Sequence, residues 1–309
     1  MRGSIFWIGI SIIILSWIGN YIFFQSKQLD TPLFLEHYYE TSINEEDEIH
    51  LPFYYITNKS DSSTVSYVNI NGEVVYPEPD AFNMWDTDAN TPQFEQEFTH
   101  HYLKSVLLTF PILPGDELWK FSGMDVHFSD GKTVHADIGQ VIMKKTESTP
   151  IVFETRMSGS DSDHLSQQTL LTTQPITINK IEVPFEELSQ DVLLKIDREQ
   201  ERLSELETLR SNGDFPSWYH DDWNKEWKDL PGKPVEDLLP LSMDKDEWIR
   251  LFMQFDSERA SYYQFSIKMV GKTDSGETFI NEMPIIDHPG LTQQKITNLI
   301  ESKKSGDVH

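Results

Sequence analysis

The stretch IFWIGISIIILSWIGNYIFF, residues Ile5–Phe24, runs for twenty residues without a charged side chain. At the rise of an α-helix this length spans about 30 Å, the thickness of the hydrocarbon core of a bilayer. A helix buried in a globular core rarely lacks every charge over such a length. The stretch therefore predicts one membrane-spanning helix that attaches the rest of the chain to a membrane.

The flanking sequence favours an uncleaved anchor over a signal peptide. The apolar region of a signal peptide is usually about 7–15 residues long and ends in a small-x-small cleavage site. Here the run is longer, and Gln25-Ser26-Lys27, which follows it, offers no such site. Trp7 and Trp17 suit the interfacial zones of a spanning helix. Arg2 precedes the span, whereas Lys27 is followed by acidic residues, so the positive-inside rule places residues 1–4 in the cytoplasm as a short tip.

Composition limits the classes of partner. The chain has 309 residues, enough for about two domains, and a net charge of −26. Such an acidic surface repels phosphate backbones, which excludes nucleic acid as a partner. The chain contains no cysteine. Disulfides are common outside eukaryotic cells, so their absence favours a bacterial cell membrane protein, although a cytosol-facing chain would need none either.

Beyond the span, most of the sequence has the pattern of β-strands and hairpins. Phe53–Thr57 is rich in aromatic and β-branched residues, and Asn71-Gly72 and Asp130-Gly131 are hairpin dipeptides. Two segments depart from this pattern. Aromatic and apolar residues recur every four positions from Phe94 to Val106, which predicts an amphipathic helix over residues 92–104, and a similar spacing of Tyr219, Trp223 and Trp227 predicts a second helix.

Two short sequence echoes indicate an internal duplication. IHLPF at Ile49–Phe53 returns as IEVPF at Ile181–Phe185, 132 positions later. DELWKF at Asp116–Phe121 returns as DEWIRL at Asp246–Leu251, 130 positions later. Two matches at nearly one offset point to repeated units.

The predicted fold is mainly β with short helices: one N-terminal transmembrane helix followed by two tandem β-sandwich domains, immunoglobulin-like in the broad sense and related by duplication. The segments are a tip at 1–4, the anchor at 5–24, a juxtamembrane stalk at 25–48, a first domain at 49–157, a linker or long loop at 158–174, a second domain at 175–290 with a helical insert near 197–230, and a C-terminal helix and tail at 291–309. We expect a strand through Val192–Ile196 just before the insert and a helix at its start, with one helix over 186–210 as the alternative.

The sequence contains no catalytic or metal-binding motif such as H-E-x-x-H, G-x-S-x-G or a phosphate-binding loop. We therefore predict no catalytic residue, no metal site and no cofactor. His127 and His135 flank the Asp130-Gly131 turn, but a two-residue loop would point them to opposite faces of the sheet. His100 and His101 are expected on the solvated face of the predicted 92–104 helix.

Aromatic residues near position 220 form the only candidate for a ligand or partner surface: Trp218, Trp223, Trp227 and His220. Tryptophan serves as a stacking platform or interface anchor. The helical spacing of Trp223 and Trp227 equally fits a buried helix face, and Trp218, which lies off that stripe, is the better surface candidate.

These features predict a membrane-anchored, extracytoplasmic, non-catalytic protein that binds or scaffolds a protein or glycan of the cell envelope. The alternative is an extracytoplasmic carbohydrate-active or metal-dependent hydrolase, which the tryptophans and scattered histidines would serve. The sequence favours a non-enzyme because it shows no catalytic signature.

Overall fold

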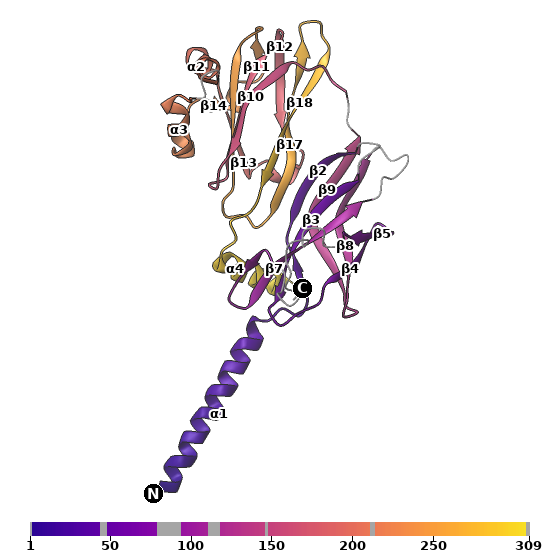
Figure 1. The fold of residues 1–309 in the computed structure, drawn as a ribbon, viewed down its shortest axis with the longest axis vertical. Coiled ribbons are helices and arrows are strands. Elements are labelled where there is room, and N and C mark those ends of the chain that lie inside the picture. Colours follow the sequence, from indigo (N-terminus) through magenta and orange to yellow (C-terminus); the bar gives the residue numbers. More distant parts are fainter. Residues whose placement is uncertain are drawn as a thin grey trace.

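A computed structural model describes residues 2–43, 48–78, 94–110, 118–145, 148–210 and 214–306. A single long helix, α1 (Arg2–Lys27), leads into a body of two β lobes (Figure 1). α1 projects away from the body, and Trp17 in its middle is 77% exposed. Among the described residues α1 is the one helix long and apolar enough to cross a membrane.

The body is built from two sheets. The larger sheet contains thirteen strands: β1 (Leu33–Phe34), β2 (His37–Ile43), β3 (Ile49–Asn58), β4 (Val65–Ile70), β5 (Glu73–Pro77), β6 (Gln96–Glu97), β7 (His101–Phe110), β8 (Leu118–Phe128), β9 (Thr133–Lys145), β12 (Ile176–Glu182), β15 (Leu241–Met243), β17 (Tyr262–Thr273) and β18 (Thr278–Asp287). The smaller sheet contains five: β10 (Phe153–Ser160), β11 (Leu165–Thr172), β13 (Val192–Asp197), β14 (Lys233–Pro234) and β16 (Trp248–Phe255).

Short helices complete the body. They are α2 (Gln200–Arg210), α3 (Ser217–Trp223) and α4 (Gln293–Gly306), with 3-10 turns η2 (Glu186–Leu188), η3 (Trp227–Asp229) and η4 (Val235–Asp237). The strand-then-helix prediction is confirmed, because β13 ends immediately before α2. The insert near 197–230 contains α2 and α3, which lie together beside the smaller sheet (Figure 1). The C-terminal helix is confirmed as α4.

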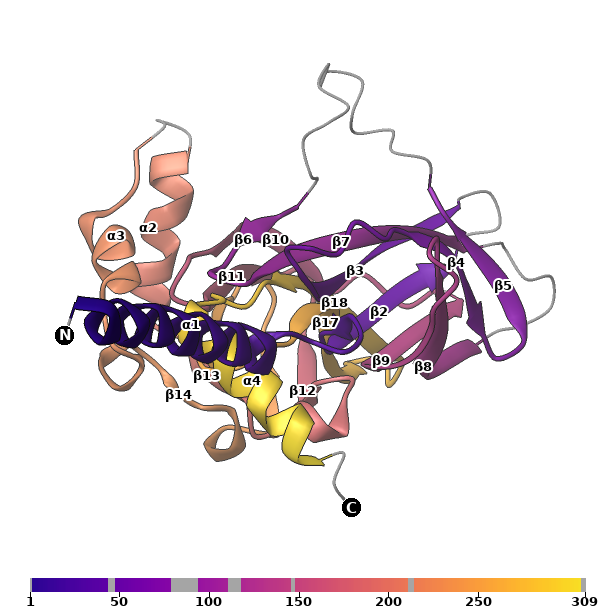
Figure 2. The ribbon, with the colours of Figure 1, turned by 90° about the horizontal axis from the view of Figure 1, so that it is seen from below.

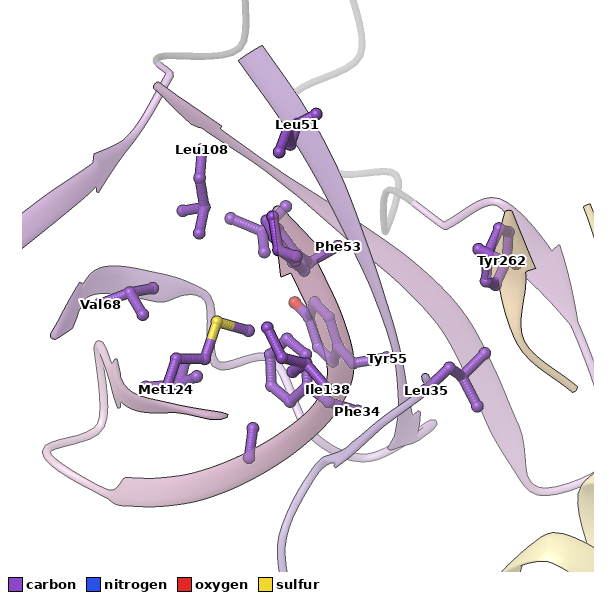
Figure 3. Close-up of a cluster of buried hydrophobic side chains, with 14 of the residues drawn as sticks. Phe34, Leu35, Leu51, Phe53, Tyr55, Val68, Leu108, Met124, Ile138 and Tyr262 are labelled. Carbon is purple, nitrogen blue, oxygen red and sulfur yellow. The ribbon is translucent and has the colours of Figure 1, made fainter. Parts of the chain in front are cut away.

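The larger sheet encloses the first core by folding over on itself. β5 pairs with β4 through Glu73–Ile70 and Val75–Val68, and with β7 through Tyr76–Thr109. The limb that contains β3 and β7 thus faces the limb that contains β4, β8 and β9. Figure 3 shows the side chains packed between them, with Tyr262 of β17 beside β3.

The second core lies on the opposite face of the same sheet. Tyr263, Phe265 and Ile267 of β17 point into it, against the five-stranded sheet. Because side chains alternate along a strand, β17 sends Tyr262 to the first core and Tyr263 to the second. The two lobes in Figure 1 are therefore two sandwiches that share one continuous sheet.

The strand β2 joins the two halves of that sheet. It pairs in parallel with β9 from His37 to Ile43 and with β17 at His37–Tyr39. Its side chains alternate between the cores: Tyr39 belongs to the first core, and Tyr38 packs on the second. Glu40 Oε1 accepts from Lys144 Nζ of β9 at 3.0 Å and from Lys268 Nζ of β17 at 2.5 Å.

The prediction of a juxtamembrane stalk over residues 25–48 is therefore wrong. Leu33–Phe34 and His37–Ile43 are strands, and Phe34 and Leu35 are buried in the first core. β2 could not be recognised from the sequence because both of its faces are covered in the fold. Its residues therefore lack the apolar–polar alternation of a half-exposed strand. Most of the acidic run that suggested a stalk, residues 45–47, lies outside the described residues.

His37 shows how tightly β2 is embedded. Its side chain is buried, its Nε2 accepts the backbone N–H of Tyr54 at 2.9 Å, and its ring stacks on Tyr262. Burial lowers the pKa of His37 to about 3, against the opposing effect of nearby backbone carbonyls. The imidazole is thus neutral, and because Nε2 is the acceptor its proton lies on Nδ1.

Two further predictions are wrong. The described part of the predicted 92–104 helix, from Phe94 onward, contains β6 and the start of β7. His101 and Leu103 are buried at alternate positions, as in a strand, rather than at helical spacing. The predicted linker at residues 158–174 lies in the hairpin of β10 and β11. β11 reads as polar, yet nearly all of it is buried because the insert covers its outer face.

The sequence echoes do not fall at equivalent positions. Ile49–Phe53 begins β3, whereas Ile181–Phe185 covers the end of β12 and the residues after it. Trp119 lies in β8 of the larger sheet, whereas Trp248 lies in β16 of the smaller one. The echoes therefore do not align the two halves.

The end of α1 is fixed to the body by several contacts. Lys304 Nζ of α4 donates to the carbonyl oxygens of Ser26 at 3.1 Å and Gln28 at 2.9 Å. His101 Nε2 lies 3.0 Å from the carbonyl oxygen of Lys27, and the Asn58 side chain exchanges two hydrogen bonds with the Leu29 backbone. Figure 2 shows α4 beside the end of α1. We call this set of contacts the α1 junction.

The α1 junction corrects the interpretation of His100 and His101, which are not on a solvated helix face. His101 is buried at the start of β7, and the ring of His100 lies edge-on to Phe24 of α1, 5.9 Å between centroids. Lysine at the C-terminal end of a helix satisfies carbonyl groups that have no partner within the helix and complements the helix dipole.

Gly139 allows β9 to approach β2, which gives a first testable prediction. Its φ is +79°, and a Cβ there would lie 2.8 Å from the carbonyl oxygen of His37. Gly131 has a similar φ of +86° with nothing within 4 Å of the added carbon. We expect Gly131→Ala to lower the free energy of unfolding by about 1 kcal/mol, from the left-handed backbone alone. Gly139→Ala should cost at least about 1 kcal/mol more, because the methyl group must displace β2.

Urea unfolding of the two variants beside the parent chain measures this difference. Equal losses of stability would contradict the close approach of β9 to β2.

Candidate functional site: a polar groove on the outer face of the first half

The outer face of β4, β8 and β9, opposite the first core, carries a row of polar side chains. Asn69 of β4 pairs with Asp125 of β8, which pairs with His135 of β9. Paired residues on neighbouring strands point to the same face. Their neighbours Val68, Val126 and Ala136 are buried. Alternation thus places this row outside because apolar side chains occupy the inner positions.

The register of the β8–β9 hairpin differs from the predicted one by one residue. The Phe128 N–H donates to the Lys132 carbonyl at 2.9 Å, and Gly131 is left-handed, so the loop has three residues rather than two. This is the turn in which a glycine follows a type I turn. Asp-Gly alone does not distinguish the two loops.

The shift in register overturns the prediction that His127 and His135 point to opposite faces. His127 pairs with Thr133, two residues from His135, so both imidazoles lie on the outer face. His135 Nδ1 lies 2.7 Å from Asp125 Oδ1, and His127 Nδ1 lies 2.9 Å from Thr133 Oγ1. Each histidine therefore has its own partner. Within the described ranges, no three His, Asp or Glu side chains are placed to hold a metal ion.

A groove of about 540 Å³ runs along this face. Gly123 provides part of its floor, beside an irregularity in the pairing of β8 with β9. A Cβ on Gly123 would lie 3.6 Å from the His135 ring and 3.3 Å from the Ala136 carbonyl. The side chains that line the groove are largely polar: Asn69, Asn71, Lys120, Ser122, Asp125, His135 and Gln140.

Two aromatic side chains lie next to the lining residues of the groove, on β4 and β5. Tyr67 precedes Asn69 by two residues on β4, and its ring stacks on His127 with centroids 4.2 Å apart. Tyr76 of β5 lies beside Tyr67 and is 64% exposed. The outer face thus combines amides, one cation, one carboxylate–imidazole pair and an exposed aromatic ring.

The residues singled out from the sequence lie elsewhere, on the α2–α3 layer that covers the smaller sheet. Trp218 and His220 are in α3, Trp223 ends α3, and Trp227 begins η3. Trp223 and Trp227 are half-buried and pack on Leu165, Leu230 and Phe252. His220 is exposed and lies against the rings of Phe215 and Tyr219.

Trp218 is half-buried and engaged on several sides. Its Nε1 donates to Glu205 Oε2 at 2.9 Å, and the guanidinium groups of Arg202 and Arg250 lie 4.3 and 5.3 Å from its ring centroid. The structure brings Trp218 and Trp223 into one apolar cluster with Tyr219, while Trp227 and His220 lie outside it.

A buried ion-pair network lies under α3 and was not predicted from the sequence. Arg250 of β16 is fully buried, and its Nη1 donates to Asp222 Oδ2 at 2.6 Å. Arg202 Nη2 donates to the same oxygen at 2.6 Å, and Lys225 Nζ to Asp222 Oδ1 at 2.8 Å. Burial lowers the pKa of Arg250, and the bond to Asp222 opposes that effect. One signal was available: Arg250 interrupts an otherwise apolar strand, Trp248–Met253.

This network explains why α3 lies on the sheet. A buried arginine requires an anion, because an unpaired buried charge is costly, and the insert supplies Asp222 to a face that otherwise carries Gln167 and Phe252. Asp222 therefore has a structural role: it neutralises the buried charge of Arg250.

Comparisons with known proteins do not identify a family for this chain. No family model and no curated protein matches the chain. Among solved structures, the C-terminal domain of the Streptococcus pyogenes antigen I/II-family protein AspA is similar over 83% of this chain and 98% of its own length, at 7% sequence identity and a TM-score of 0.16. A TM-score this low does not define a common fold, and we draw no conclusion on function from it.

Asp222 gives the second testable prediction. Asp222→Asn leaves two guanidinium groups and Lys225 without their shared anion, so we expect the free energy of unfolding to fall by about 3 kcal/mol or more. Asp221 is the adjacent exposed carboxylate, and Asp221→Asn should change stability by no more than about 0.5 kcal/mol. Denaturant unfolding compares the two, and similar stabilities would show that the network does not hold α3 in place.

Proposed function

We propose that this protein is a membrane-anchored, extracytoplasmic, non-catalytic scaffold that binds a component of the cell envelope. In this proposal α1 spans the membrane once, residues 1–4 are cytoplasmic, and the β body stands outside. The weak excess of positive charge at the N-terminal end of α1 supports this orientation. The acidic body and the absence of cysteine support a bacterial envelope protein that does not bind nucleic acid.

The α1 junction is the observation that carries the proposal. A signal peptide is removed, so the folded body has no need to contact it. Here Lys304 of α4 and His101 of β7 hold the last turn of α1, and Asn58 of β3 holds Leu29, two residues after it. Phe24, within the apolar span itself, lies edge-on to the ring of His100 of the body. The helix end is thus part of the folded body, as expected for a permanent anchor.

The same contacts favour a scaffold with a set orientation over a loosely tethered domain. Leu29 is the second residue after α1, and β1 begins at Leu33, so little free chain separates the helix from the sheet. A body joined in this way presents the same faces to the membrane and to the exterior. A partner would therefore meet the outer groove in a defined position.

We further propose that the two sandwiches are immunoglobulin-like in the broad sense and arose by duplication. The strand pairs β3–β7, β4–β8 and β8–β9 have counterparts in β11–β16, β12–β17 and β17–β18. Both final hairpins turn at a left-handed glycine, Gly131 and Gly276. This alignment replaces the one suggested by the sequence echoes, and it divides the chain into units of β2–β9 and β10–β18.

Single cysteines can test the topology because the parent chain has none. We introduce Gly3→Cys at the tip and Asp274→Cys in the exposed β17–β18 turn of the full-length chain, and treat protoplasts with a maleimide that does not cross membranes. The cysteine at position 274 should react in intact protoplasts, whereas the cysteine at position 3 should react only after permeabilisation.

The intact mass of the membrane-extracted chain should include α1. A mature chain that begins after residue 24, or labelling of position 3 from outside, would contradict the proposed anchor.

A further inference from the structure

We propose that the groove on the outer face of β4, β8 and β9 binds an uncharged, polyhydroxylated ligand: a segment of a neutral glycan. The inference rests on the proposed role as a binding scaffold and names its ligand class. The sequence had suggested Trp218 and its neighbours in the insert as a ligand surface. The proposed glycan site lies instead in the other half of the molecule.

The charge of the groove selects against ionic ligands. Lys120 is the one full positive charge among the lining residues, and Asp125 already faces His135 at 2.7 Å. The body as a whole is strongly acidic, with a net charge of −26 for the chain, and repels anionic ligands at long range. A cationic ligand would have to compete with His135 for the single carboxylate. The groove therefore fits a ligand without net charge.

The side chains of the groove match hydroxyl groups. A hydroxyl both donates and accepts, and an amide offers two donors and an acceptor on one planar group. Three amides, Asn69, Asn71 and Gln140, line the groove together with Ser122. In a chain so rich in carboxylates, a groove lined by amides is a local departure from the surface composition. Such convergent polar groups on a concave surface fix the orientation of a ligand.

Side-chain hydrogen bonds to the backbone hold two of these amides, Asn69 and Asn71, in place. Asn71 and Gly72 form the two-residue turn between β4 and β5, with φ of +53° and +92°, and the Gly72 N–H donates to Asn69 Oδ1 at 3.1 Å. The Asn71 side chain reaches the Lys120 carbonyl across to β8 at 3.4 Å. Polar groups that are fixed before binding lose little entropy when a ligand arrives.

The aromatic border supplies the apolar part of sugar recognition. A sugar ring has a C–H face as well as hydroxyl groups, and an aromatic ring with an apolar face and a polar tip can cover that face. Tyr67 precedes the groove residue Asn69 by two positions on β4, and Tyr76 of β5 is exposed beside Tyr67. An extended glycan can thus place one residue among the amides and the next against Tyr76.

The test uses the full-length chain in detergent with a panel of oligosaccharides. The probes are neutral hexose and N-acetylhexosamine oligomers, matched carboxylated and sulfated oligomers, and neutral peptides of similar length. Saturation-transfer NMR identifies binders, and titration gives their affinities. We expect at least one neutral oligosaccharide to bind and the anionic versions to bind at least about tenfold more weakly.

Variants locate the site. Asn69→Ala and Gln140→Ala each remove one amide and should weaken binding by about tenfold, the loss expected for a ligand hydrogen bond. Tyr76→Ala removes an exposed ring and provides a third variant if an amide variant fails to fold. Gln294→Ala changes an exposed amide of α4, far from the groove in sequence and element, and should bind as the parent does.

Three results would overturn the inference: no binding of neutral oligosaccharides, equal binding of anionic ones, or binding that the three groove variants leave unchanged. Selective binding of the peptides would also overturn it. None of these outcomes affects the cysteine labelling pattern or the intact mass, so the failure of this site and the failure of the proposed anchor are distinguishable.

Discussion

The pairing of β2 with both β9 and β17 is the constraint on which the rest of the structure depends. A strand inserted in parallel between two other strands leaves no free edge at the middle of the sheet, so the two halves become one surface. Because side chains alternate, one strand supplies Tyr39 to the first core and Tyr38 to the second. Removing β2 would expose both cores at once. The segment that follows α1 thus holds the two sandwiches together.

This arrangement links α1 to the groove through a short path. The α1 junction fixes the helix end to β3, β7 and α4, and β2 follows within ten residues of Lys27. β2 then pairs with β9, the strand that carries His135 and Gln140 of the groove. Each step is made of backbone pairing or of side-chain hydrogen bonds to the backbone. The outer face is therefore held in a fixed position relative to α1.

The sequence predicted the elements whose signal is local. A run of apolar residues from Ile5 to Phe24 indicated α1, Asn71-Gly72 indicated a tight hairpin, and the C-terminal helix expected within 291–309 is α4. The mistaken elements are those whose environment comes from distant parts of the chain. β2 and β11 lack alternation because tertiary contacts cover both of their faces, and Phe94–Val106 fits a helical period and a strand period equally.

The candidate site was missed for a related reason. The groove depends on the register of the β8–β9 hairpin, and a difference of one residue in its loop moves His135 to the face shared by His127. The aromatic residues near position 220 were prominent in the sequence, but they serve packing: Trp218 and Tyr219 lie over Arg250, and Trp223 and Trp227 pack on the cluster of Leu165, Leu230 and Phe252. The polar side chains of the groove come from single positions on β4, β8 and β9, so they form no motif in the sequence. The strand pairing is needed to show that they lie together.

Native-state hydrogen exchange in the full-length chain tests most directly whether β2 couples the two halves. Tyr39 is buried in the first core and its hydroxyl donates to the Pro52 carbonyl at 2.8 Å, so Tyr39→Ala loosens β2 from the first core. If β2 joins the halves, the amides of β8–β9 and of β17–β18 should both lose protection, by similar opening free energies. Loss of protection confined to β8–β9, with β17–β18 exchanging as in the parent, would contradict the account.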